Sequence, residues 1–283
     1  MTSAHHAAME STSSVVALIL ILILASLFYL RGWRRTFSFS MGVTPVWRAV
    51  SFLLGMFLIW LALGSPLSTY DHDLLTAHMI QHLLLMTFAP ALILLGEPVL
   101  AVWHGLPRVA RDALGRLFQS RWMQRLAHAL SRLTLCWTVS AFTLVAWHIP
   151  SVFTAALHSS ALHAFEQASF FGAGFLFWWP VIEPWPSSKA SSRWPILLYL
   201  FLATLPCDIL SGFLVFSERI AYPVYFSAPR HFGLSGLADQ ECAGALMWTV
   251  VTVVYLVPAA IITTRLLSPR RSHRVEQEVT TLR

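Results

Sequence analysis

Hydrophobic and polar residues follow one another along this chain in long blocks. Apolar runs with few charges recur between shorter polar segments, and each is close to the roughly 17–25 residues that a helix needs to cross a bilayer. Seven such runs are predicted as membrane spans: 13–30, 46–66, 74–95, 133–150, 161–182, 194–217 and 242–264. Proline and glycine interrupt several runs, which membrane helices tolerate. The pattern predicts an all-α, polytopic membrane bundle of about seven transmembrane helices, forming a single domain over residues 1–268.

The composition supports this prediction. Of the 283 residues, 57% are hydrophobic and only 11% are charged, and the mean hydropathy is +0.65. An ordinary soluble domain has roughly 25% charged residues. The chain therefore has too little polar surface to cover a water-soluble globule.

Basic residues mark the predicted orientation. When the loops are assigned in turn to the two sides of the membrane, all but Arg219 and Arg230 of the 19 Lys and Arg fall on one side. The positive-inside rule makes that side cytoplasmic. We therefore expect an external N-terminus, a cytoplasmic C-terminus with a short tail at 269–283, and no nucleic-acid partner despite the net charge of +6. The Arg-rich segment 107–131 is expected to be an amphipathic helix on the inner surface, against membrane lipids.

Histidine has the opposite distribution. Of the 12 histidines, only three are assigned to the cytoplasmic side: His104, His128 and His273. His78 and His82 open the third span four residues apart, so they share one helical face, and Met86 continues that face by a further turn. Imidazoles with a nearby thioether suit copper, haem iron or zinc. We predict a metal site in the outer half of the membrane with His78 and His82 as its core ligands.

Other spans bring ligand-capable residues to the same predicted depth. The further metal candidates are His148, His163, Met79, Met86 and Met247, the supporting candidates are Gln81, Glu166, Asp239 and Gln240, and the thiol candidates are Cys207 and Cys242. Glu166 follows His163 by three residues, so it is expected to orient that ligand or to bind metal itself. Hydrogen bonding between helices is the alternative explanation for such residues. The chain has no phosphate-binding loop, no H-E-x-x-H and no G-x-S-x-G, and no enzymatic activity is expected.

Several motifs together resemble the multi-span bacterial cytochrome c oxidase assembly factor CtaG family. They are, in chain order, His78-Met79-x-Gln81-His82, Ala89-Pro90, Gly96-x-Pro98, Trp147-His148-x-Pro150, His163-x-x-Glu166, Phe177-Trp178-Trp179-Pro180, Tyr222-Pro223-x-Tyr225, Asp239-Gln240 and Gly244-x-x-Met247-Trp248. The resemblance implies a multi-pass protein of the bacterial plasma (inner) membrane that assists assembly of a haem-copper oxidase. It also implies that the partners are cytochrome c oxidase subunits.

The residues and the resemblance suggest one mechanism and leave three alternatives. In the mechanism, an outer-half site holds Cu(I), receives it from a periplasmic or extracellular copper donor, and passes it to an immature oxidase subunit by ligand exchange. The first alternative is a membrane zinc hydrolase with three ligands and an open position. The second is a membrane protein that binds haem through two histidines. The third is a metal-free scaffold for oxidase subunits.

Overall fold

The fold is a helical bundle with no strand among the residues that the structure describes. The computed structural model describes residues 2–39, 45–123, 125, 132–182, 193–229 and 231–268. Its main helices are α1 (Thr2–Phe39), α2 (Val46–Leu63), α3 (Leu75–His82), α4 (Ala89–Leu95), α5 (Pro98–Gly105), α6 (Arg108–Phe118), α8 (Leu133–Trp147), α9 (Pro150–Leu157), α10 (Ser160–Ile182), α11 (Trp194–Phe216) and α12 (Gly236–Leu267). The short helical turns are η1 (Pro66–Thr69), η2 (Leu83–Phe88), η3 (Pro223–Phe226) and η4 (His231–Gly233). The predicted all-α class is confirmed.

Most of the predicted spans correspond to long apolar helices. Five described segments are long and apolar enough to cross a membrane: Ser13–Arg35, Val46–Thr69, Leu75–Leu95, Trp194–Phe216 and Gly236–Leu267. The α8–α9 pair makes a sixth if its 74° bend lies within one span. The fifth predicted span is α10, which has 23 residues like α11 but is less apolar because it contains Glu166 and Gln167. The count of seven therefore stays a prediction.

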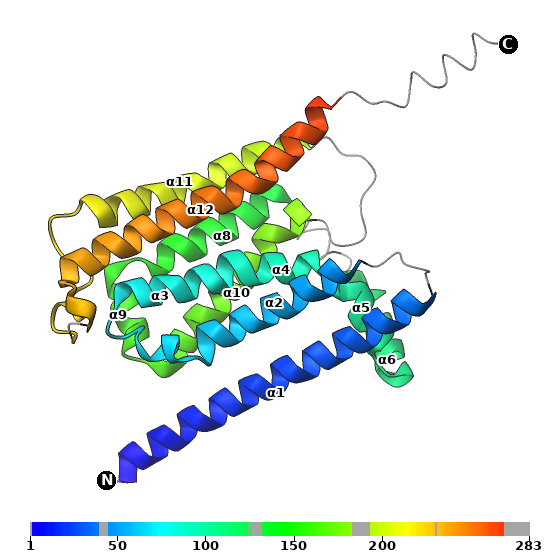
Figure 1. Ribbon diagram of the computed structural model, residues 1–283, viewed down its shortest axis with the longest axis horizontal. Helices are drawn as coiled ribbons and strands as arrows, with labels where there is room; N and C mark the ends of the chain where they lie inside the picture. Colours follow the sequence, from blue (N-terminus) through cyan, green and yellow to red (C-terminus); the bar gives the residue numbers. More distant parts are fainter. Residues whose placement is uncertain are drawn as a thin grey trace.

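Successive long helices run in opposite directions, so the bundle has two distinct ends. Loops 64–74 and 217–235 lie at one end, here called the histidine end, together with α9 (Figure 1). The other end, here called the arginine end, contains helices α5 and α6 and the first turns of α2. The described part of the chain begins near the first end and finishes near the second, as an odd number of crossings requires. Which end faces the cytoplasm stays a prediction.

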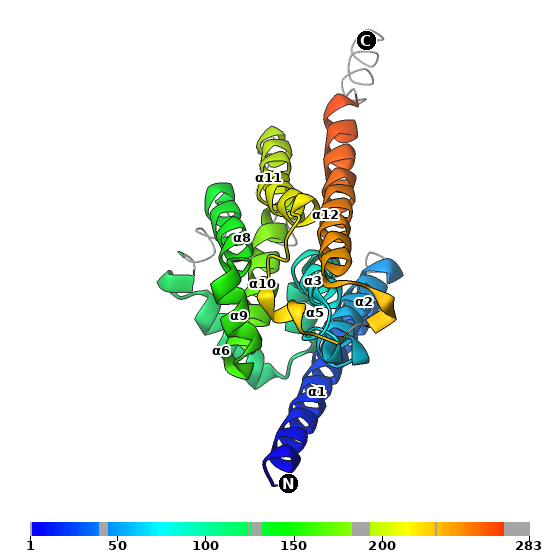
Figure 2. The ribbon, with the colours of Figure 1, turned by 90° about the vertical axis from the view of Figure 1, so that its left-hand side faces the viewer.

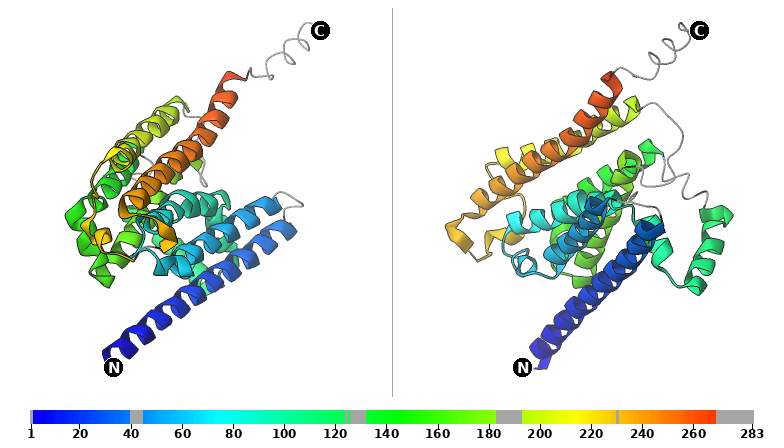
Figure 3. Two further views of the ribbon diagram at one scale, coloured as in Figure 1. Left: turned by 60° about the vertical axis from the view of Figure 1, so that its left-hand side comes forward. Right: turned by 45° about the vertical axis from the view of Figure 1, so that its right-hand side comes forward.

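Helix α10 occupies the middle of the bundle. It packs against α4 on one side and α8 on the other, and α11 pairs with α12, which also contacts α3 (Figure 2). Helix α1 lies at the edge, where its contacts are with α2 and α5 (Figure 3). The predicted surface segment 107–131 is helical over Arg108–Phe118. Residues 124 and 126–131, like the predicted tail at 269–283, lie outside the described residues.

The third span changes its helical pitch just after the two histidines. Between α3 and α4, residues Leu83–Phe88 form a π-helix, and Pro90 follows it. Pro90 has no N–H to donate to the carbonyl of Met86, four residues earlier, and π-bulges are common where an α-helix must absorb such a defect. A Cβ on Gly174 of α10 would lie 2.3 Å from the Met86 carbonyl oxygen. Glycine at 174 therefore lets the two backbones touch at this bulge.

A sharp bend between α8 and α9 positions His148. Ile149 is extended, with φ −66° and ψ 123°, because a residue before proline avoids the helical region. The bend leaves His148 buried at the corner, where its carbonyl accepts a 3.1 Å hydrogen bond from the Tyr222 hydroxyl. The bend therefore brings the end of α8 against the loop between α11 and α12.

Candidate metal centre

Helices α3 and α10 bring three metal-binding side chains together. His78 and His82 lie one turn apart on α3, and their Nε2 atoms are 2.6 Å apart. Oε1 of Glu166 on α10 lies 3.6 Å from Nε2 of His78 and 3.4 Å from Nε2 of His82. The two nitrogens and the carboxylate oxygen thus converge on one point. These three residues form the His-His-Glu cluster.

The His-His-Glu cluster is buried and short of hydrogen-bond partners. The side chains of His78 and Glu166 are 0% exposed and that of His82 is 7% exposed. Neither carboxylate oxygen of Glu166 accepts a hydrogen bond from the described residues, and Nδ1 of each histidine has no partner there. An ionised carboxylate removed from water without a compensating group is costly. A bound cation is one group that would offset this cost, and the donor set fits one.

The separations also suit a single ion. Ligand bonds of about 2.0–2.1 Å in tetrahedral geometry separate donor atoms by about 3.3 Å. The two Glu166–histidine separations already match this value. The His78–His82 separation would have to open by several tenths of an ångström, which a small rotation of either ring provides.

Two more predicted histidines flank the cluster. Nδ1 of His148 donates to the Leu144 carbonyl at 2.7 Å, so its buried Nε2 is free to accept. The His148 and His82 ring centroids are 6.4 Å apart. The centroid of the His163 ring is 5.7 Å from that of His78. The structure thus gathers the four predicted histidines around one position in the bundle.

Glu166 and His163 have different partners from those expected. The sequence left two roles for Glu166, to orient His163 or to bind metal itself. In the structure Glu166 faces the two α3 histidines, while Nε2 of His163 lies 3.4 Å from Oδ2 of Asp71. Residues three apart on a helix point in directions that differ by about 60°, so they reach different neighbours. Asp71 and His72 complete this second group and were not among the predicted ligands, because they lie in a loop outside any apolar run.

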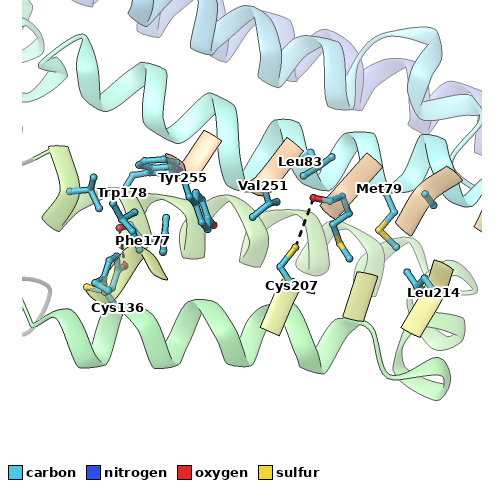
Figure 4. Close-up of a cluster of buried hydrophobic side chains, with 14 of the residues drawn as sticks. Met79, Leu83, Cys136, Phe177, Trp178, Cys207, Leu214, Val251 and Tyr255 are labelled. Carbon is cyan, nitrogen blue, oxygen red and sulfur yellow. Dashed lines mark hydrogen bonds between the residues drawn. The ribbon is translucent and has the colours of Figure 1, made fainter. Parts of the chain in front are cut away.

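A small cavity with sulfur-bearing walls adjoins the cluster. Its volume is about 50 Å³, and His82 and His148 line it together with Met79, Met86, Cys207 and Met247. Figure 4 shows Met79 and Cys207 in this part of the core, well separated from Cys136. The thioether candidates of the sequence analysis thus lie beside the histidines, where soft donors would favour Cu(I).

The predicted polar supports bond to backbone groups. Asp239 of α12 accepts the N–H groups of Leu75 and Thr76 at 2.7 and 3.1 Å, and so caps the start of α3. Gln240 accepts from the Ala221 N–H and donates to two carbonyls near the end of α11. Gln81 donates to the Ala62 carbonyl at 3.0 Å. These side chains fix the helices that carry the histidines.

The two predicted thiols do not form a pair. Cys207 is buried with Sγ 3.8 Å from the Ser211 hydroxyl, whereas Cys242 is exposed, and both are free. They lie on α11 and α12, whose facing positions here are occupied by Gly244 and Ser211 rather than by Cys242. Of the two thiol candidates, only Cys207 therefore lines the cavity beside the histidines.

A buried tyrosine connects the loops at the histidine end. The Tyr225 hydroxyl donates to the Asp71 carbonyl oxygen at 2.7 Å. Burial, with smaller contributions from the nearby carboxylates of Asp71 and Asp239, raises the pKa of Tyr225 well above its ordinary value. The phenol therefore stays protonated and holds loop 64–74 in place.

Comparison with known proteins agrees with the motifs. A family model described as cytochrome c oxidase caa3 assembly factor matches residues 27–268. The chain is 27% identical over 228 residues to uncharacterized proteins of Mycobacterium bovis and Mycobacterium tuberculosis, and 26% identical over 245 residues to one of Mycobacterium leprae. These alignments cover 77%, 77% and 82% of this chain but 34%, 34% and 35% of the relatives, so the chain spans about a third of their length. No solved structure matches the chain. Since the family model covers most of its length, the chain is a membrane protein of the cytochrome c oxidase caa3 assembly factor family.

Proposed function

We propose that this protein assists assembly of a haem-copper cytochrome c oxidase by binding a copper ion at the His-His-Glu cluster and releasing it to an oxidase subunit. The observation that carries the proposal is the buried Glu166 carboxylate, which has no hydrogen-bond donor among the described residues and faces two imidazole nitrogens. Intramembrane ionisable groups arranged in this way mark functional sites.

The adjoining cavity supports delivery as well as binding. An ion that leaves the His-His-Glu cluster past His82 meets Met79, Met86 and Met247 next. Thioethers bind Cu(I) weakly enough to exchange, and His148 presents a buried unpartnered Nε2 on the same wall. Stepwise exchange among these donors moves an ion without exposing it to water.

The proposal includes a location and a direction. The protein lies in the bacterial plasma membrane with the histidine end outside, where oxidase copper sites are reached and where an extracellular or periplasmic donor supplies copper. The asymmetry of the basic residues supports this orientation. The nearest partners are the immature oxidase subunits that accept the ion.

A complementation experiment tests the proposed function. A bacterium without this gene would receive the wild-type gene, His78→Ala/His82→Ala, or the matched control His158→Ala, which removes an exposed histidine that donates only to the Thr154 carbonyl in the described contacts. We expect the double variant to give an oxidase with normal haem but little copper, partly restored by added copper. Fully copper-loaded oxidase in cells with the double variant, at equal protein levels, would contradict the proposal.

A zinc hydrolase is the second candidate. Two histidines and a glutamate also bind zinc in catalytic sites that keep a fourth position for water, and the cavity of about 50 Å³ beside His82 has room for one water. Purified protein that holds zinc and not copper would favour this candidate. Haem is less compatible, because the cavity is far smaller than a porphyrin. If the purified protein binds oxidase subunits but contains no metal, the metal-free scaffold is the alternative that would be supported.

A further inference from the structure

A second group of donors lies between the His-His-Glu cluster and the surface. Asp71 in loop 64–74 has Oδ2 3.4 Å from Nε2 of His163 and Oδ1 3.7 Å from Nε2 of His72. The His72 and His163 rings lie face to face with centroids 5.5 Å apart. The carboxylate therefore stands between two imidazoles and offers one oxygen to each.

In this second group the carboxylate is buried, while one of the imidazoles is exposed at the surface. The Asp71 side chain is 4% exposed, whereas the His72 side chain is 55% exposed. Oδ1 of Asp71 has no hydrogen-bond partner among the described residues, although it is buried. His72, with its Nε2 3.7 Å away, is too distant to satisfy it. The arrangement thus provides a desolvated anionic ligand behind an imidazole that reaches the surface.

His163 connects this group with the buried cluster. Its Nε2 accepts a 2.7 Å hydrogen bond from the Gln167 amide, so this nitrogen carries a lone pair and no proton, and it becomes available to a metal ion when the Gln167 side chain turns away. The His163 ring stacks on His72 on one side and lies edge-on to His78 on the other, with centroids 5.7 Å apart. One imidazole therefore lies within reach of an ion in either group.

We propose that Asp71, His72 and His163 form a receiving site that captures copper from outside and passes it through His163 to the His-His-Glu cluster. This inference rests on the proposed function. The transfer proceeds by exchange of one ligand at a time. His78 replaces His72 while His163 holds the ion, then Glu166 replaces Asp71, and finally His82 replaces His163. The ion keeps its oxidation state, and no bond within the protein breaks.

The order of the two sites can be tested by the rate of loading. Purified protein in detergent would be mixed with Cu(I) under anaerobic, reducing conditions and treated at increasing times with an excess of a Cu(I) chelator, which removes accessible copper, before the retained copper per chain is measured. We expect His72→Ala to reach the same final copper content as the wild type but roughly tenfold or more slowly, because a ligand on the entry route has been lost. Since His72 is exposed, this substitution leaves the core packing intact.

Two further variants make the result specific. His72→Asp, which restores a ligand, should recover much of the rate, and His158→Ala, which removes an exposed histidine near the same end, should load like the wild type. Equal loading rates in the wild type and in His72→Ala would overturn the receiving site and leave the proposed function standing. A wild-type protein that retains no copper at any time would instead contradict the proposed function.

Discussion

Replacement of Glu166 by glutamine distinguishes two roles for this carboxylate: a ligand of a metal ion, or one partner of a purely structural ion pair with the histidines. The carboxylate is fully buried, both of its oxygens lack donors among the described residues, and its nearest polar atoms are the two imidazole nitrogens at 3.4 and 3.6 Å. Glutamine keeps the shape of the side chain and removes the charge. The substitution therefore tests what the charge does in this position.

The expected effects on the metal-free and copper-bound protein differ in sign. A buried polar group without a partner costs about 1–3 kcal/mol, and a charged one costs more. Glu166→Gln should therefore leave the metal-free protein as stable as the wild type, or more stable by an amount of that order. Copper affinity should fall by roughly 100-fold or more, because even residues that only orient a ligand change affinity by about 10–100-fold. A 100-fold loss corresponds to about 2.8 kcal/mol of binding free energy.

The assay compares two buried carboxylates at the same end of the bundle. Thermal unfolding in detergent, followed by tryptophan fluorescence, gives the relative stabilities, and competition with a copper chelator gives the affinities. The comparison variant is Asp239→Asn, which weakens the cap on α3 and should cost about 1 kcal/mol of stability, with a far smaller loss of copper affinity than Glu166→Gln because Asp239 is not in the His-His-Glu cluster. If Glu166→Gln destabilises the protein to the same extent and binds copper normally, the carboxylate serves only to hold the helices together.

Three further results are expected. Gly174→Ala should destabilise the protein by about 1–3 kcal/mol, because its Cβ would lie 2.3 Å from the Met86 carbonyl oxygen. Gly172→Ala is the control, since its Cβ meets open space and the variant should be as stable as the wild type or more stable. Equal unfolding temperatures for the two variants would contradict the close approach of α10 to the π-helix. Cys242 is exposed near the histidine end, while Cys136 and Cys207 are buried. A membrane-impermeant maleimide added to intact cells should therefore label Cys242 alone. Labelling only after cell lysis would reverse the proposed orientation. Tyr225→Phe removes the hydrogen bond to the Asp71 carbonyl and should cost about 0.5–1.5 kcal/mol, measured by the same unfolding assay; an unchanged stability would show that this bond does not hold loop 64–74.

The helices could be predicted from the sequence because the bilayer requires long apolar runs. The run at 74–95 corresponds to Leu75–Leu95, and that at 194–217 to Trp194–Phe216. The π-helix within the first of these was not predicted. Pro90 is visible in the sequence, but how the helix absorbs the missing hydrogen bond, and the close approach of α10 at Gly174, depend on packing. The mean hydropathy of a whole span does not reveal a local change of helix type of this kind.

The candidate site was predictable in part. The spacing of His78 and His82 fixes their common face in any α-helix, and the structure places them together. The partner of Glu166 depended on how α10 packs against α3, which the spacing to His163 does not determine. Asp71 lies in a polar loop 95 positions before Glu166 and gave no periodic signal, so only the three-dimensional structure connects it with His163.

The central claim is that His78 and His82 hold copper. Its most direct test is the copper content, by elemental analysis, of the purified membrane protein and of His78→Ala/His82→Ala after identical loading and washing. The account predicts about one tightly held copper ion per wild-type chain and almost none in the double variant, because the cluster then keeps a single carboxylate ligand. Equal copper in the two proteins would contradict the account.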